Sequence, residues 1–392
     1  MLVLVSVKLA YLQIFKYGEI GARAIESWQR SFPLEASRGN IYDRNGNIIA
    51  SSLPTMSVAI IPYQVNDFDV VSGYLATILN SNKDTIYNKI NKRVSIVKLS
   101  PMGRKLTMEQ ASKIYDLDLD GVYLLQDSLR YYPYGTLLAH TLGFVGVDNQ
   151  GLSGIELYYE EYLKGKNGTL NYILDAKGGL VGNYSSEIVM PSQGMSITLT
   201  IDLTIQQIIE RVLYNSYLKY SPESAYAIAM NPNTGEILGI SSFPTYDPNN
   251  YQDYDSSIYN HNLPIWASYE PGSTFKPMIF AAGLNEGLFD PYKDTYYDKG
   301  YVTVGGATIK SWKKGGHGLQ TFVELLQNSS NPGMVEISSR LGNDKMYEYI
   351  KLFGIGRKTG VDLMGESKGI MFSKDNYGVV EQATTSFGHG KV

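Results

Sequence analysis

The sequence has no cysteine among its 392 residues and only four histidines. Without cysteine, disulfide bonds, thiolate catalysis and cysteine-ligated zinc are excluded. The histidines stand far apart, at positions 140, 261, 317 and 389, and no His-Glu-x-x-His pattern is present. Because no residue pattern asks for a metal ion or an organic cofactor, we predict neither.

A strong excess of charge of one sign is also missing. The chain has 34 lysines and arginines against 38 acidic residues, for a formal net charge of −4. A nucleic-acid-binding protein would need a basic face, so we do not expect a nucleic acid as partner. With 43% hydrophobic and 18% charged residues, the composition predicts a folded chain. Its length allows two or three domains.

The opening run MLVLVSVKLAYLQIF is strongly apolar, with Lys8 inside it. It is shorter than the roughly 20 residues that a membrane-spanning helix needs. No small-residue cleavage site follows, so a removable signal peptide is not expected. The run is either a buried helix or the last part of a membrane anchor. We favour the second alternative, in which residues 1–16 are the end of the anchor.

One short stretch, EPGSTFKP at residues 270–277, carries the first sign of chemistry. Ser273 and Lys276 are three residues apart, after a Pro-Gly turn signal and before an apolar helix predicted to end near Gly287. This spacing places both side chains on one helix face, where the lysine amine can reach the hydroxyl. Ser-x-x-Lys is one way to activate a serine nucleophile without histidine.

The pattern is not specific, since Ser95, Ser216 and Ser311 also have a lysine three residues on. Ser95 lies in an alternating, strand-like run, and Ser311 lies in a glycine-bounded loop. Ser216 lies near the C-terminal end of a predicted helix, where the helix dipole disfavours an oxyanion. Ser273 alone combines the spacing with a helix N-terminus. A helix-capping serine beside a solvated lysine remains the structural alternative.

A second group of polar residues lies in the Ser-Ser-Asn-Pro turn between two predicted helices. Pro332 suits the first turn of the second helix, with Asn331 as its cap and Gly342 as its end. Ser329 could relay a proton near a nucleophile, and Asn331 could bind a substrate amide. Helix capping explains the same residues, and it is the favoured interpretation when this turn is considered alone.

The remaining patterns predict an α+β fold. Residues 36–52 indicate a β-hairpin around Asn45-Gly46. Arg38, Asp43 and Arg44 are expected to form an ion-pair cluster beside this hairpin.

In the second half of the chain, a strand at 194–202 and a helix at about 203–220 precede two strands within 225–242. This order predicts a β-sheet flanked by helices, with the helix of Ser273 following the start of the sheet.

Taken together, these motifs resemble those of the class B penicillin-binding proteins, the membrane-anchored peptidoglycan D,D-transpeptidases. RGNIYDRNG, RYYPYG and GLSGIELYYEEYLKG resemble motifs of that family's N-terminal pedestal, and LTID with Gln206 resembles the start of its transpeptidase domain. EPGSTFKP matches its Ser-x-x-Lys motif, and SSN matches its Ser-x-Asn motif. WKKGGHGLQTF, QNSSNPGM and FGIGRKTGVDLMGE are most similar to the sporulation (stage V sporulation protein D) and Gram-positive division branch.

The resemblance implies an organisation in three parts. Residues 1–16 would be the end of a single N-terminal membrane anchor, and residues 17–190 would be the pedestal or dimerisation domain. Residues 191–392 would be a transpeptidase domain that lacks its C-terminal part. The protein would then lie at the cell membrane with its catalytic domain outside the cytoplasm.

The resemblance also implies roles for four residues. Ser273 would attack the penultimate D-Ala of a peptidoglycan stem peptide, release the terminal D-Ala and pass the acyl group to an amine of a neighbouring stem. β-Lactams would acylate the same serine. Lys276, with a pKa lowered by burial, would accept the proton, Ser329 would carry a proton toward the leaving group, and Asn331 would orient the substrate. Glycosyltransferase and divisome or sporulation proteins would be its partners.

The family's third motif, Lys-Thr-Gly on a strand, has a misleading match in this chain. Lys358-Thr359-Gly360 continues as VDLMGESKG, which lacks the alternation of a strand. By the resemblance, the catalytic triplet follows an SFG-x-G stretch, which is matched here by residues 386–390. We therefore expect the chain to lack this motif, to be poorly active or inactive, and to leave a sheet neighbour unpaired.

Four functions are alternatives to a transpeptidase, and they differ in the fate of the acyl-serine or in whether the serine is acylated at all. A β-lactamase or a β-lactam-sensing domain would share the first motifs, but neither needs the pedestal. A D,D-carboxypeptidase would use water as acceptor, which the sequence does not distinguish. A non-catalytic scaffold of a division or sporulation complex could use the pedestal alone.

Overall fold

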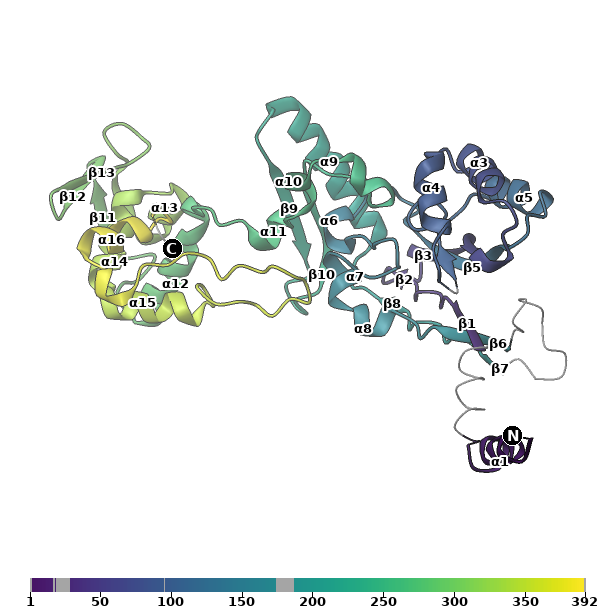
Figure 1. Ribbon diagram of the computed structural model, residues 1–392. Coiled ribbons are helices and arrows are strands. Elements are labelled where there is room, and N and C mark those ends of the chain that lie inside the picture. The colour runs from purple at the N-terminus through teal and green to yellow at the C-terminus, as the bar shows by residue number, and fades with distance from the viewer. Residues whose placement is uncertain (1, 17, 19–28, 95, 174–186, 391–392) are drawn as a thin grey trace. The chain divides into compact units, whose positions relative to one another are not determined.

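A computed structural model describes residues 2–16, 18, 29–94, 96–173 and 187–390 of the chain (Figure 1). The contacts between residues divide the chain into two compact units, Met1–Asn260 and His261–Val392. These are called unit 1 and unit 2 below. Ser95, which was expected to lie in a strand, is outside the described residues.

The first part of unit 1 contains α1 (Leu2–Ala10), which continues into the π-helical turn η1 (Tyr11–Phe15). Within the described part of the chain, no helix combines the length and the apolar character needed to cross a membrane. A three-stranded antiparallel sheet then joins β1 (Gln29–Leu34), β6 (Gly168–Ile173) and β7 (Glu187–Val189).

A second sheet of unit 1 is built around the long strand β3. Its strands are β2 (Ile41–Tyr42), β3 (Ile48–Ile60), β4 (Val97–Lys98), β5 (Val122–Tyr131) and β8 (Ile197–Thr198). The order is β4-β3-β2-β8, with β5 also paired to β3. The hairpin expected at 36–52 is confirmed: Ile41 pairs with Ala50, and Gly46 has a φ of +85°, which glycine adopts readily.

Three capped helices lie with this sheet: α3 (Phe68–Ile78), α4 (Lys83–Ile90) and α5 (Met108–Asp116). The side chains of Asp67, Asn82 and Thr107 accept hydrogen bonds from the first turns of these helices, as N-caps do. Apolar residues of the helices and of β3 form one buried core, which includes Val58 and Leu75. This core fixes the helices to the sheet.

The short helices α6 (Ala139–Leu142), α7 (Gly154–Tyr158) and α8 (Glu160–Leu163) complete the first part of unit 1. The ion-pair cluster that was predicted for Arg38, Asp43 and Arg44 does not form between these residues. Arg38 is paired with Glu156 and Glu160, whereas Asp43 accepts hydrogen bonds from the hairpin turn. The partners of Arg38 lie more than a hundred residues away, so no local pattern could identify them.

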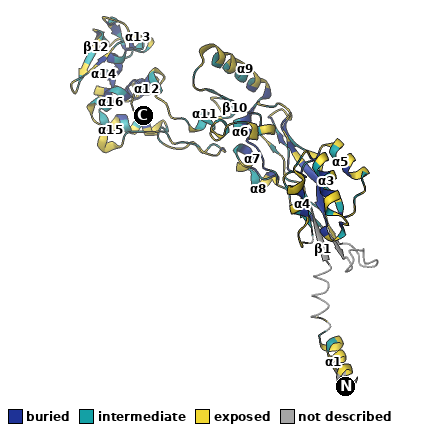
Figure 2. Cartoon of the chain, turned by 45° about the horizontal axis from the view of Figure 1, so that its top comes forward, coloured by how far each residue is buried: buried dark blue, intermediate teal, exposed yellow. Residues whose placement is uncertain are grey.

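The second part of unit 1 holds α9 (Leu203–Tyr220), β9 (Ala225–Met230), β10 (Ile237–Phe243), η3 (Pro248–Asp253) and α10 (Ser256–Tyr259). The buried Gln206 side chain bonds the amide and the carbonyl of Ile240, which fastens α9 to β10. Most of α9 is otherwise exposed or half-buried (Figure 2). Among the described strands, β9 pairs with β10 alone.

Residues 191–260 belong to unit 1 together with the preceding sheets and helices. Tyr246 is fully buried against Phe144 and Ala139, and the Tyr246 hydroxyl donates to the Ala139 carbonyl. Tyrosines at 251, 254 and 259 pack around this cluster. The division by contacts thus falls after Asn260, while the expected domain boundary at residue 190 stays a prediction.

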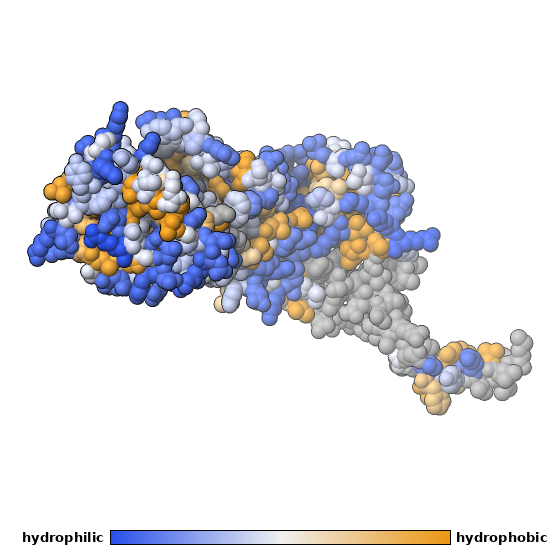
Figure 3. Space-filling view, turned by 90° about the vertical axis from the view of Figure 1, so that its left-hand side faces the viewer, coloured by the Kyte–Doolittle hydropathy of each residue, from blue (hydrophilic) through white to orange (hydrophobic). Residues whose placement is uncertain are grey.

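Unit 2 is a helical core with two strand pairs at its side. Its helices are α11 (Leu263–Trp266), η4 (Gly272–Phe275), α12 (Lys276–Asn285), α13 (Phe322–Gln327), α14 (Asn331–Leu341), α15 (Asn343–Leu352), η5 (Lys374–Asn376) and α16 (Val379–Thr385). β11 (Thr295–Asp298) pairs with β14 (Gly318–Thr321), and β12 (Tyr301–Val304) pairs with β13 (Ala307–Lys310). Phe275, Phe322 and Met334 lie in one core cluster. On the face seen in Figure 3, apolar areas lie between hydrophilic side chains.

Candidate active site

The nucleophile stretch begins with the short turn η4, which runs directly into α12. Ser273 therefore lies in the first helical turn, as predicted, and α12 ends two residues before Gly287, whose φ is +65°. Gly272, at a φ of +59°, makes the sharp bend before the serine. The Ser-x-x-Lys spacing is thus built on a helix N-terminus.

The Ser-Ser-Asn turn joins α13 to α14, and its backbone is strained at one residue. Ser329 has a φ of +52°, in the left-handed region that non-glycine residues seldom adopt. The cap of α14 is Ser330, which accepts a hydrogen bond from the Gly333 amide, so the expected cap at Asn331 is wrong. Asn331 is instead the first residue of the helix, which frees its side chain for other contacts.

The four residues expected in the site come together. Ser329 Oγ donates to Ser273 Oγ at 3.0 Å. Lys276 Nζ donates to Ser329 Oγ at 2.9 Å, to the Ser329 carbonyl at 2.7 Å and to Asn331 Oδ1 at 2.7 Å. In the described part of the chain, no hydrogen bond joins Lys276 directly to Ser273. The lysine was expected to reach this hydroxyl itself, but Ser329 lies between the two groups.

Lys276 is a buried cation, because only 1% of its surface is exposed. Burial lowers the pKa of its amine to about 8. Its three hydrogen-bond acceptors favour the ammonium form and oppose this effect, but no ion pair of the described chain supplies Lys276 with a carboxylate. With a pKa of about 8, roughly a tenth of the amine is neutral at pH 7.

A buried carboxylate, which sequence reasoning missed, supports the Ser-Ser-Asn turn from below. Asp298, at the end of β11, accepts a hydrogen bond from Ser330 Oγ at 2.8 Å and from the Gly300 amide at 2.7 Å. Asp298 and Ser330 are both fully buried. The N-terminus of α14 beside it favours the negative charge. The Asp-Lys-Gly sequence signals a turn here, but only the fold brings that turn under Ser330.

The segment after β13 supports the turn from its other side. Asn331 Nδ2 donates to the Lys310 carbonyl at 3.1 Å, and the Trp312 indole donates to the Asn328 carbonyl at 2.8 Å. The bond to Lys310 orients the Asn331 amide so that its oxygen faces Lys276, and the bond from Trp312 holds the residue before Ser329. No sequence signal marks Lys310 for this role, because the backbone carbonyl makes the contact.

The SFGHG stretch at 386–390 contacts the turn that carries the nucleophile. The Gly272 amide donates to the Gly388 carbonyl at 2.9 Å, and the Gly390 amide donates to Glu270 Oε1 at 2.8 Å. Gly388 has a φ of +74°, and a Cβ there would lie 2.2 Å from the Gly272 carbonyl oxygen. Only glycine fits this close approach, so the stretch helps to hold the serine in position.

Lys358-Thr359-Gly360 lies in an exposed loop rather than in a strand. The amide and hydroxyl of Thr359 both donate to Glu366 Oε1 at 2.6 Å, and the Gly360 amide donates to Glu366 Oε2. None of the hydrogen bonds of the described residues links this loop to Ser273 or Lys276. This geometry supports the prediction that the triplet is not the catalytic third motif.

The other serines with the same spacing lie in less suitable places. Ser216 is inside α9, where its hydroxyl donates to the Val212 carbonyl. Ser311 lies in the loop after β13, as expected. Neither has a helix N-terminus behind it, and among the described residues only Ser273 contacts the Lys276 cluster through Ser329.

Comparisons with known proteins agree with this site. A model of the penicillin-binding protein dimerisation domain matches residues 33–199, and a model of the penicillin-binding protein transpeptidase domain matches residues 225–392. The two models together match most of the chain. The second includes every residue of the Ser273 cluster.

Named relatives extend the similarity along the whole chain. Stage V sporulation protein D of Bacillus subtilis is 46% identical over 387 residues, covering 99% of this chain and 60% of that protein. Peptidoglycan D,D-transpeptidase FtsI of Escherichia coli is 30% identical over 362 residues, covering 91% of this chain and 60% of that protein. This chain therefore spans about 60% of the length of both relatives.

A solved structure of a peptidoglycan synthetase from Bifidobacterium adolescentis superposes with a TM-score of 0.69 at 27% identity, covering 93% of this chain and 70% of that one. The likeness thus holds in three dimensions as well as in sequence. Since a penicillin-binding protein dimerisation domain precedes a transpeptidase domain in this chain, it belongs to the class B penicillin-binding proteins.

Proposed function

We propose that this protein is a serine D,D-transpeptidase that cross-links peptidoglycan stem peptides and is acylated by β-lactams. The observation that carries this proposal is the hydrogen-bonded series from Ser273 through Ser329 to the buried Lys276. A nucleophile on a helix N-terminus, coupled to an amine with a pKa of about 8, is suited to acyl transfer near neutral pH.

The first half-reaction exchanges one acyl bond for another. The Ser273 oxygen forms a bond to the carbonyl carbon of the penultimate D-Ala, and the bond from that carbon to the terminal D-Ala nitrogen breaks. The serine proton moves to the neutral Lys276 amine and then to the departing nitrogen. In the second half-reaction an amine of another stem attacks the ester carbonyl carbon, the bond from that carbon to the Ser273 oxygen breaks, and the proton lost by the amine passes through Lys276 to this oxygen.

Ser329 is placed to pass this proton between the other two groups. When Lys276 is charged, it donates to Ser329, which donates to Ser273. When Lys276 is neutral, both hydrogen bonds can reverse: Ser273 then donates to Ser329, and Ser329 donates to the amine. Asn331, with its side-chain oxygen on Lys276, would orient both the amine and the substrate backbone.

The cellular setting is also a proposal. Residues 1–16 would be part of a membrane anchor, with the transpeptidase domain outside the cytoplasm. Glycosyltransferase and divisome or sporulation proteins would be the partners. The similarity to a stage V sporulation protein D and to a division-type transpeptidase supports a role in sporulation or division.

Labelling with a fluorescent penicillin tests the proposal in the full gene product, meaning this chain with whatever its gene encodes before residue 1 and after residue 392. We expect labelling that Ser273→Ala abolishes and that Lys358→Ala leaves unchanged, since Lys358 lies in the exposed loop. Labelling that survives Ser273→Ala would contradict the proposed nucleophile. Loss of labelling in Lys358→Ala would instead show that this triplet is the third motif.

Turnover separates a transpeptidase from a scaffold with the same fold. The full gene product should release D-Ala from a soluble peptide that ends in D-Ala-D-Ala and should transfer the acyl group to an added amine. Release without transfer would indicate a carboxypeptidase. Neither release nor transfer, in a protein that penicillin labels, would favour the scaffold.

The rate of acylation should depend on pH through Lys276. Since burial lowers the pKa of Lys276 to about 8, the neutral amine becomes more abundant as the pH rises. The second-order rate constant for penicillin acylation should therefore rise about tenfold per pH unit below about 7, rise more slowly between about 7 and 9, and be constant above about 9. The penicillin carboxylate is ionised throughout this range. A rate that falls or stays constant between pH 6 and 8 would be inconsistent with a lysine base.

A further inference from the structure

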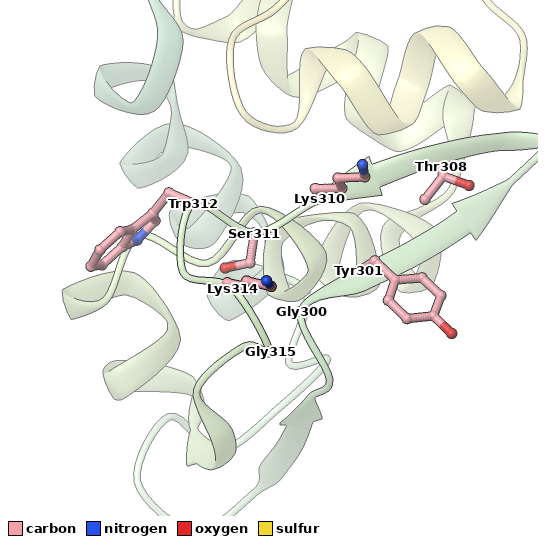
Figure 4. A pocket seen from close by; sticks show the side chains of 8 residues that line it. All are labelled: Gly300, Tyr301, Thr308, Lys310, Ser311, Trp312, Lys314 and Gly315. Carbon is pink, nitrogen blue, oxygen red and sulfur yellow. The ribbon is translucent and has the colours of Figure 1, made fainter.

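A hollow of about 490 Å³ lies beside the Ser-Ser-Asn turn, between the β12–β13 pair and the loop that follows it (Figure 4). Its lining includes Tyr301, Thr308, Lys310, Ser311, Trp312 and Lys314. This volume is large enough for a whole amino-acid side chain, and the hollow is open to solvent. The proposed reaction uses none of these side chains.

The hollow is rich in uncompensated positive charge. Lys310 and Lys314 line it, and Lys299 and Lys313 stand next to lining residues in the chain. In the described part of the chain none of these four lysines forms an ion pair, and no carboxylate is among the lining residues. The nearby Asp298 is fully buried and engaged by Ser330 and Gly300. For a chain with net charge −4, this concentration of lysines is unusual and favours an anionic ligand.

A polar group without a partner also points to a ligand. The Ser311 hydroxyl is buried at the wall of the hollow and has no hydrogen-bond partner among the described residues. Leaving such a group unsatisfied costs free energy, so a hydrogen-bonding ligand there would be stabilising. The side chain of Ser311 lies between those of Trp312 and Lys314 in Figure 4.

The wall of the hollow is tied to the catalytic turn. The Lys310 carbonyl accepts from Asn331, and the Trp312 indole donates to the Asn328 carbonyl. A peptide whose end is held at Ser273 and Asn331 would therefore extend past residues that also line the hollow. The lysine ammonium groups supply charge there without taking part in the acyl transfer.

We propose that this hollow binds an ionised side carboxylate of the donor stem peptide, the one whose D-Ala-D-Ala end reacts with Ser273. The inference rests on the proposed function and adds a specificity site to it. Lys310 and Lys314 would contact the carboxylate, and Ser311 would donate a hydrogen bond to it. Stems that carry a carboxylate at this position would be preferred over stems in which it is a carboxamide.

Binding of two soluble peptides tests this subsite directly. Both end in D-Ala-D-Ala, and they differ only in one side group, which is a carboxylate in the first and a carboxamide in the second. The full gene product would carry Ser273→Ala, so that neither peptide is consumed. Calorimetry gives the affinity, and a change in tryptophan fluorescence that is lost in Trp312→Phe reports binding at this place, because the Trp312 side chain lines the hollow.

We expect the carboxylate peptide to bind about tenfold more tightly than the carboxamide peptide, as two lysine contacts would give. The double variant Lys310→Gln with Lys314→Gln should bind both peptides equally. The double variant keeps the hydrogen bond from Asn331 to residue 310, because the acceptor is the backbone carbonyl of that residue. Lys358→Gln is the matched control: it removes the same charge from an exposed residue in a loop that does not line the hollow, and the preference should remain.

Three results would overturn the subsite: equal affinity of the two peptides, a preference that survives in the double variant, or no measurable binding of either peptide. These results can be told apart from a failure of the proposed function. If penicillin still labels Ser273, the nucleophile stands and only the subsite is wrong. If penicillin does not label Ser273, the proposed function fails, whichever peptide binds.

Discussion

Replacing Lys276 with methionine is expected to lower the second-order rate constant for penicillin acylation of Ser273 by about 10²- to 10⁴-fold, the usual contribution of a general base. Methionine has a similar length and fits the buried position, but it accepts no proton. The burial that lowers the pKa of Lys276 to about 8 makes this amine suited to take a proton near neutral pH. Stopped-flow quenching or time-resolved fluorescent labelling measures the rate.

Lys276→Arg separates a base from a fixed positive charge. Arginine keeps the charge and several donors but does not lose a proton in proteins. We therefore expect it to be as slow as the methionine variant. A Lys276→Arg protein that acylates within tenfold of the wild-type rate would show that charge, rather than basicity, is what Ser273 needs.

Two controls show whether a slow variant is still folded. Lys358→Met makes the same chemical change in an exposed loop and should leave the rate unchanged. In Lys276→Met, loss of a buried ammonium is favourable, whereas Ser329 and Asn331 lose a donor, so the two effects on stability oppose each other. Circular dichroism should show a folded protein.

Features that depend on neighbouring residues could be predicted from the sequence. The helix α9 begins at Leu203 and ends at Tyr220, as predicted. Asp202 caps its first turn, and its apolar residues recur at the spacing of a helix. The hairpin at 36–52 and the helix of Ser273 follow from turn residues in the same way. The four site residues were found because they are parts of two short motifs.

Features that depend on distant residues could not be predicted. Asp298 reaches Ser330 across 32 positions, and Arg38 reaches Glu156 across 118. Each of the three residues of the Ser-Ser-Asn turn is able to cap a helix. The residue that caps α14 is Ser330, which also donates a hydrogen bond to the buried Asp298. The relay position of Ser329 also depends on its left-handed backbone, which no local residue preference indicates.

Glu156→Ala is expected to destabilise unit 1 by about 3–5 kcal/mol, the cost of removing one partner from a buried charge network. Glu156 is fully buried at the start of α7, and its carboxylate receives Arg38 Nε at 2.5 Å and Arg130 Nε at 2.6 Å. The Tyr132 hydroxyl also donates to it. Glu160 can still pair with Arg38 in the variant, but Arg130 would lose its carboxylate.

Hydrogen exchange in the amides of β3 and β5 is the measurement for Glu156→Ala, because these paired strands form the centre of unit 1 and Arg130 lies near the end of β5. Protection of these amides should fall in the alanine variant and fall less in Glu156→Gln, which keeps a hydrogen-bond acceptor. Glu109→Ala breaks an exposed ion pair with Lys113 and should change nothing measurable. If Glu156→Ala behaves like this control, the network contributes no net stability, and its role is to fix the order in which α7 and the two arginine-bearing segments pack.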